Sequence, residues 1–242
     1  MALYDVAYGD EHIRFSLRFL VRAARSVSIH VTPDGAVLVD APEGTTLPEV
    51  KKAVRQRAAW VWQQLQASKA RKLHVLPREY ISGETHFYLG RRHMLKVQPA
   101  HGDELGVRLW RGRLEITTAK RDALTVRYML EGWYRERATE VFARVIADMS
   151  PRVGLRRAPP PLRLLSMRTQ WGSCSPKGEV LLNTHLVKAP RPCIEYVVVH
   201  ELCHLKELNH SERFYRQLDR ALPDWVVRKA ELDNMAEVLL NR

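Results

Sequence analysis

One short stretch of the chain constrains its fold and chemistry more than any other. It runs from His200 to His210 and reads His-Glu-Leu-Cys-His-Leu-Lys-Glu-Leu-Asn-His. On a helix, side chains four residues apart lie on one face, so His200 and His204 can both offer a ring nitrogen to one metal ion. Glu201 lies about a quarter-turn away, within reach of a water molecule at that metal. Neutral imidazoles suit Zn²⁺, so the spacing predicts a helix that carries a zinc site.

His210 is the predicted third ligand. If the helix continued as far as His210, its side chain would point about 240° away from the histidine pair, so the helix must end first. Asn209 tolerates the left-handed conformation that ends many helices, and Ser211 suits the N-cap of a helix from Glu212 to about Leu222. Glu207 is the alternative ligand, and we disfavour it because it stays on the first helix.

The same histidines could instead be ordinary residues of a protein core. An apolar stripe argues against this reading, because it gives the helix a separate face to bury. The stripe consists of Ile194, Val197, Val198, Leu202, Leu205 and Leu208. Three protein ligands leave a fourth tetrahedral position open for water, whose pKa falls to about 7. The pattern therefore favours a reactive metal centre over a closed structural one.

Composition places the chain among soluble globular proteins. Of its 242 residues, 45% are hydrophobic and 27% are charged. No run of about 18 apolar residues is present, and the first residues lack the basic and apolar regions of a secretory signal, so we expect no membrane partner. The three cysteines, Cys174, Cys193 and Cys203, show no paired spacing, which predicts a reduced, cytoplasmic protein. Nothing in the sequence indicates an oligomeric state.

The formal net charge of +12 is spread along the whole chain. Arg14, Arg18 and Arg22 form one face of a predicted strand. A diffuse basic surface favours nucleic acid as a partner but defines no reading site, and a basic surface that is merely solvated is the alternative.

Hydrophobic periodicity predicts a chain with both strands and helices and no internal repeat. The expected strands are 12–22, 27–31, 36–40, 80–82, 85–89, 94–97, 106–110, 114–117, 162–167 and 180–186. The first expected helix begins at 46 or 47 and ends at 71. The other expected helices are 123–149, the zinc-site segment, 212–221 and 223–240. A turn at Thr32-Pro33-Asp34-Gly35 joins two strands. In the first helix, Val50, Val54, Trp60, Val61 and Leu65 are expected to supply the buried face.

Several motifs together carry a family resemblance. They are Trp171-Gly172-Ser173-Cys174-Ser175, Gly178 to Asn183, Tyr196 to Leu205, Asn209-His210-Ser211, and Phe214. In this order and spacing the chain resembles the YgjP-like metallopeptidase family, which is similar to the SprT-like and M48 zinc peptidases. The resemblance is specific over about 167–218 and weaker before it. It implies that His200, His204 and His210 bind zinc and that Glu201 is the general base. Relatives usually carry a basic residue where this chain has Gln170.

The resemblance also implies a fold class. We expect an α+β protein, with a β-rich N-terminal region over 1–118 that contains the helix 46–71. A helical zincin-like metallopeptidase domain with a small antiparallel sheet follows over 119–242. In such peptidases an extended substrate pairs with a strand edge, here 171–175 or 180–186. His185 and Tyr215 are the candidates for stabilising the oxyanion.

The expected function is hydrolysis of peptide bonds in a protein or peptide substrate, by a zinc-activated water and the Glu201 carboxylate, with nucleic acid as a suggested neighbour. The first alternative is a metal-dependent nucleotide pyrophosphatase, because an activated water and a basic surface serve that chemistry as well. The second is a nucleic-acid-associated module with a structural metal.

Overall fold

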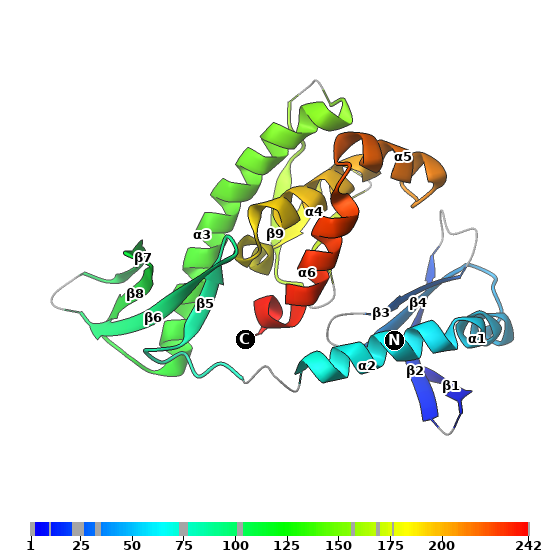
Figure 1. The fold of residues 1–242 in the computed structure, drawn as a ribbon, viewed down its shortest axis with the longest axis horizontal. Coiled ribbons are helices and arrows are strands. Elements are labelled where there is room, and N and C mark those ends of the chain that lie inside the picture. The colour runs from blue at the N-terminus through cyan, green and yellow to red at the C-terminus, as the bar shows by residue number, and fades with distance from the viewer. Residues whose placement is uncertain are drawn as a thin grey trace. The chain divides into compact units, whose positions relative to one another are not determined.

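The computed structural model describes residues 3–9, 11–20, 27–31, 35–72, 77–100, 104–155, 158–167, 170–175 and 177–241. The chain forms two compact units, Met1–Leu76 and Pro77–Arg242 (Figure 1). We expected the division after residue 118. It falls earlier because the strands between 85 and 118 pack with the long helix that follows them and therefore belong to the second unit.

The first unit is a four-stranded sheet with two helices packed against it. Its elements are β1 (Leu3–Tyr8), β2 (Glu11–Leu20), β3 (Ser28–Val31), β4 (Val37–Pro42), α1 (Leu47–Gln56) and α2 (Ala58–Lys72). Phe15 and Val39 on the sheet, with Val54 on α1, are fully buried in its core. Residues 32–34 of the predicted turn, and Arg22, lie outside the described residues.

The predicted single helix of this unit is in fact two. Thr46 and Glu49 form a capping box that starts α1, and α1 ends at Gln56, with Arg57 as its C-cap. Val54 and Val61 are buried as predicted, whereas Trp60 is 43% exposed, so its assignment to the buried face was wrong.

The second unit holds two sheets and the remaining helices. Its strands are β5 (Thr85–Tyr88), β6 (Arg91–Pro99), β7 (Gly106–Trp110), β8 (Arg113–Thr118), β9 (Leu162–Leu165), β10 (Gly172–Cys174) and β11 (Val180–Asn183). Its α-helices are α3 (Ala123–Met149), α4 (Arg191–His204), α5 (Glu212–Ala221) and α6 (Trp225–Leu240), with short 3₁₀ helices η1 (Ser150–Val153) and η2 (Thr184–Lys188). The expected α+β class is confirmed. The expected helix 123–149 is also confirmed.

Several predicted strands of this unit differ from the structure: 94–97 is part of the longer β6, and 162–167 ends at Leu165. Residues 80–82 form no strand, because Tyr80 adopts a positive φ of 58° that a strand cannot accommodate. The predicted strand 180–186 ends at Asn183, whose side chain accepts a hydrogen bond from the backbone N–H of His185 and so starts η2. The small sheet is mixed: β11 pairs with β10 antiparallel and with β9 parallel.

α3 packs against both sheets of the second unit and against α4. It contacts β7 and β8 of one sheet, and also β9, η1, η2 and α4. Phe142, Val145 and Ile146 on α3 share one buried core with the apolar side of α4. This packing fixes the helix that carries the histidine pair against a rigid support.

Each unit contains a four-stranded sheet of the same topology, although the sequence shows no repeat. The strand orders are β1-β2-β4-β3 and β5-β6-β8-β7, and in both sheets the inner pair is parallel and the outer pairs are antiparallel. Gly35 and Gly112, which precede the last strand in chain order of each sheet, both adopt the left-handed conformation, with φ of 77° and 79°. A capped helix then follows each sheet, with N-caps at Thr46 and Asp122.

Candidate metal centre

The centre is built on α4. Pro192 lies in the first turn, where a proline is tolerated, and the apolar side of the helix is buried in the core. The helix ends at His204, earlier than expected. Asn209 is not among the described residues with a positive φ, so the predicted left-handed end at Asn209 was wrong. Two residues, Leu205 and Lys206, instead form a turn directly after the helix.

The segment after α4 turns back through backbone and side-chain hydrogen bonds. The His204 Nδ1 atom lies 3.0 Å from the carbonyl oxygen of Glu207, which accepts its proton. The backbone N–H of Ser211 donates to the carbonyl of Asn209 at 2.7 Å. Ser211 then caps α5 as predicted, since its hydroxyl accepts from the backbone N–H of Phe214 at 3.3 Å. These contacts bring His210 back toward the helix.

The three histidines converge through their Nε2 atoms. The Nε2 atom of His200 lies 3.2 Å from that of His204 and 3.0 Å from that of His210. Two ligands on a tetrahedral zinc with bonds of about 2.0–2.1 Å would be separated by roughly 3.3 Å, so the observed spacings fit a shared ion. Because the Nδ1 proton of His204 is held by a carbonyl, its Nε2 keeps the lone pair that a metal needs.

The electrostatics of the cluster favour the neutral imidazole. Burial, followed by the neighbouring His204 and His210, lowers the pKa of His200 to about 3. Burial also lowers the pKa of His204. Neutral imidazole is the form that binds metal, so the lowered pKa values of His200 and His204 favour metal binding at these two rings.

Phe214 forms the floor beneath the three rings. Its ring centroid lies 4.9, 4.7 and 4.8 Å from those of His200, His204 and His210, and its side chain is fully buried. The first residues of α5 thus position the histidines by packing as well as by the loop.

Glu201 lies on the inner side of α4. It is 5% exposed, and burial raises its pKa to about 8. Its carboxyl group contacts β10 at Gly172, where an added Cβ would lie 2.9 Å from Glu201 Oε1. Cys174, two residues along the same strand, has a pKa raised first by burial and then by the charge of Glu201. The carboxyl is therefore held between α4 and β10 in a poorly hydrated environment.

The remaining predicted site residues separate into two groups. Tyr215 lies at the centre, with its ring 6.3 Å from that of His210. His185 instead lines a small pocket with Tyr134 and Lys188, on the α3 side of the unit. The alternative ligand Glu207 accepts a hydrogen bond from the Ser211 hydroxyl at 3.4 Å.

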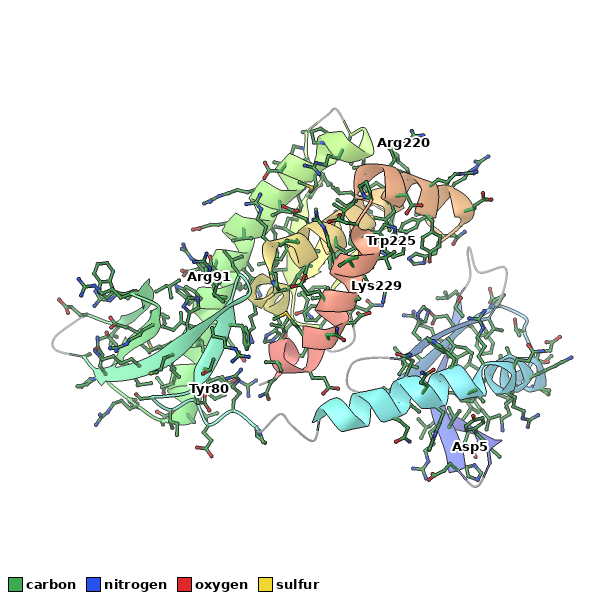
Figure 2. The ribbon with its side chains drawn as sticks, in the orientation of Figure 1. Asp5, Tyr80, Arg91, Arg220, Trp225 and Lys229 are labelled. Carbon is green, nitrogen blue, oxygen red and sulfur yellow. The ribbon has the colours of Figure 1, made fainter. Side chains whose placement is uncertain are left out.

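Sequence reasoning missed an aromatic wall beside the histidines. Tyr196 lies one helical turn before His200, and their ring centroids are 6.0 Å apart. The ring of Trp225, at the start of α6 (Figure 2), stacks between Tyr196 and Tyr215 at 6.1 and 5.8 Å. The spacing of four residues between Tyr196 and His200 is the signal that could have found the first of these residues.

The expected basic strand face and the expected lack of a membrane partner can each be compared with the structure. On β2, Arg18 donates two hydrogen bonds to the Asp40 carboxylate, each of 2.8 Å, so part of the predicted basic face is already paired. Within the described part of the chain, no helix combines the length and the apolar character needed to cross a membrane.

Converging imidazoles beside a buried carboxylate define a candidate metallohydrolase centre. The chain belongs to the YgjP-like metallopeptidase family, whose metallopeptidase domain matches residues 25–235. This confirms the resemblance drawn from the motifs.

Individual relatives match shorter parts of the chain. Over 49 residues it is 43% identical to the UTP pyrophosphatase of Escherichia coli (strain K12). The matched segment is 20% of this chain and 29% of that protein. The metallopeptidase zymogen abylysin of Pyrococcus abyssi is 22% identical, with a TM-score of 0.35 over 40% of this chain and 94% of its own. The zymogen jannalysin of Methanocaldococcus jannaschii is 17% identical, with a TM-score of 0.32 over 37% and 93%.

Proposed function

We propose that the protein is a zinc-dependent peptidase, with His200, His204 and His210 as metal ligands and Glu201 as the general base. The observation that carries the proposal is the convergence of three Nε2 atoms next to a buried carboxyl group. Membership of a metallopeptidase family supports it. Zinc held there would supply a Lewis acid that polarises a carbonyl group and acidifies a water molecule.

The protein's own residues move the proton. The Glu201 carboxylate takes a proton from the attacking water and later delivers it to the leaving amine nitrogen. Burial raises the pKa of this carboxyl, and a more basic carboxylate is a stronger proton acceptor. The Tyr215 hydroxyl is our candidate for stabilising the oxyanion, because its ring lies beside His210, whereas His185 lines a pocket on α3.

A peptide substrate would pair with β10. Among the described strands, β10 is at one end of the order β10-β11-β9 and contacts α4, which places its outer edge next to the helix of the proposed metal ligands. Extended peptides bind such edges through the backbone hydrogen bonds that build sheets. We therefore assign 171–175, rather than 180–186, as the substrate edge.

A second candidate function is hydrolysis of a nucleoside triphosphate. The 43% identity over 49 residues to a UTP pyrophosphatase favours it. A metal-activated water and a general base would serve phosphoanhydride hydrolysis as well as peptide hydrolysis.

Two further proposals concern the surroundings of the protein. The free thiols of Cys174, Cys193 and Cys203 support a reducing, cytoplasmic location. The net charge of +12 supports contact with nucleic acid through a diffuse basic surface.

One experiment separates the two catalytic candidates. Purified protein is stripped of metal, reloaded with zinc, and assayed on an unstructured peptide library and on UTP in parallel. We expect zinc-dependent peptide cleavage that the chelator abolishes. Release of pyrophosphate from UTP without peptide cleavage would replace the first candidate with the second. Inactivity on both substrates with a stoichiometric, inert zinc would indicate the structural-metal alternative.

A further inference from the structure

The contact between Gly172 and Glu201 has no assigned role. Gly172 is the first residue of β10 and pairs with Leu182 of β11. It is not among the described glycines with a positive φ, so its backbone conformation does not require glycine. A glycine in a strand loses packing and costs conformational entropy, and it often marks a place where another group approaches closely.

The approaching group is the side chain of Glu201. A Cβ atom added at Gly172 would lie 2.9 Å from Glu201 Cγ, 2.9 Å from Oε1 and 3.1 Å from Cδ. Non-bonded carbon atoms normally approach to about 3.5–4.0 Å, so any side chain at Gly172 must displace the Glu201 carboxyl. The three nearest atoms all belong to Glu201, which makes the conflict specific to this side chain.

The neighbours of Gly172 leave Glu201 little room to move. Glu201 is 5% exposed and lies on a helix most of whose residues are buried in the core. Alternate residues of a strand share a face, so Cys174 lies on the same side of β10 as Gly172, and its pKa responds to the charge of Glu201. A carboxyl pushed away from Gly172 therefore cannot settle elsewhere on this strand without meeting Cys174.

We infer that Gly172 is a positioning residue: its missing side chain creates the seat in which the Glu201 carboxyl rests at the reactive position. The kinetic part of this inference rests on the proposed role of Glu201 as general base. The contact itself does not depend on which reaction the protein catalyses.

The test measures the kinetics of Gly172→Ala and its melting temperature in a double-mutant cycle with Glu201→Ala. Gly172→Ala should bind zinc as the wild type does and keep its KM, but lose roughly 100-fold in kcat, because a misplacement of about 1 Å costs that much. Gly172→Ala should also lower the melting temperature of the otherwise wild-type chain. In a Glu201→Ala background, where the clashing atoms are gone, the same change should leave the melting temperature unchanged.

Gly106→Ala is the matched control. Gly106 is also the first residue of a strand in this unit, and a Cβ there would meet nothing within 4 Å. The Gly106→Ala substitution should change neither kcat nor the melting temperature.

Each outcome decides the inference. Wild-type kcat in Gly172→Ala, or an equal loss of melting temperature in both backgrounds, would overturn it. If Gly172→Ala does not fold, the double variant should fold, and its failure would also overturn the inference. Full turnover of Glu201→Gln would refute the proposed function alone, because the stability cycle still measures the contact.

Discussion

Replacing the aromatic floor of the centre should cost both stability and metal affinity. Phe214 is 0% exposed and contacts all three histidine rings at 4.7–4.9 Å. Phe214→Ala removes a fully buried ring that the neighbouring helices cannot collapse to replace. Such a change costs about 3–5 kcal/mol. In a unit of this size, 1 kcal/mol shifts the melting temperature by about 2–4 °C, so the expected fall is about 6–20 °C.

Calorimetry of the full chain in metal-free buffer tests this expectation, and the transition that zinc raises identifies the metal-bearing unit. Titration of zinc into the folded variant should also show weaker binding, because the three imidazoles lose their common support. Tyr128→Ala is the control, since Tyr128 is an aromatic helix residue that is 80% exposed. A loss below about 1 kcal/mol in Phe214→Ala, with unchanged zinc affinity, would refute the claim that packing positions the histidines.

Three other predictions follow from the described contacts. Burial lowers the pKa of His86 to about 3, so stability is present above the unfolded value of about 6.5 and is lost as the pH falls toward 3. The wild type should lose about 1.6 kcal/mol more than His86→Gln between pH 6.5 and pH 5 in denaturant titrations, with the exposed His12→Gln as control. Equal losses in all three proteins would contradict this. Substituting any one of the three proposed ligands with alanine should reduce bound zinc in metal analysis, and full zinc in His210→Ala would remove that residue from the ligand set. If the basic surface binds DNA, the logarithm of the affinity should fall linearly with log salt. Arg14→Ala should lower the slope by about 0.9, whereas Arg18→Ala should change it less, because Arg18 is already paired with Asp40. No binding at physiological salt would show that the basic surface does not bind DNA.

Local signals in the sequence predicted the secondary structure around the candidate centre. The spacing of His200 and His204 placed both on one face of a helix, and Ser211 was correctly expected to cap the next one. Both features depend on residues within one or two turns of each other. The long amphipathic pattern of α3 was also sufficient, because a helix of that length is dominated by its own periodicity.

Features set by distant residues could not be predicted. The break at Arg57, the left-handed Tyr80 and the end of α4 at His204 each depend on what packs against the segment. The close packing of the Glu201 side chain against Gly172 brings together residues far apart in the chain. The sequence alone shows only a glycine at position 172, with no sign of what packs against it.

The division into units was displaced for a related reason. In the sequence, the strands from β5 to β8 continue the N-terminal strands without a boundary, because both sets are short apolar segments separated by turn residues. Only the packing of α3 against β7 and β8 reveals that the second set belongs with the centre.

The most direct test of the central claim compares wild-type protein with Glu201→Gln, both loaded with zinc. The substitution keeps the shape of the side chain and removes its ability to take a proton. We expect equal zinc per chain, an unchanged melting temperature in the zinc-loaded state within a few degrees, and a fall in peptide turnover of at least about 10²-fold. Turnover of Glu201→Gln equal to that of the wild type, with zinc bound in both, would contradict the account.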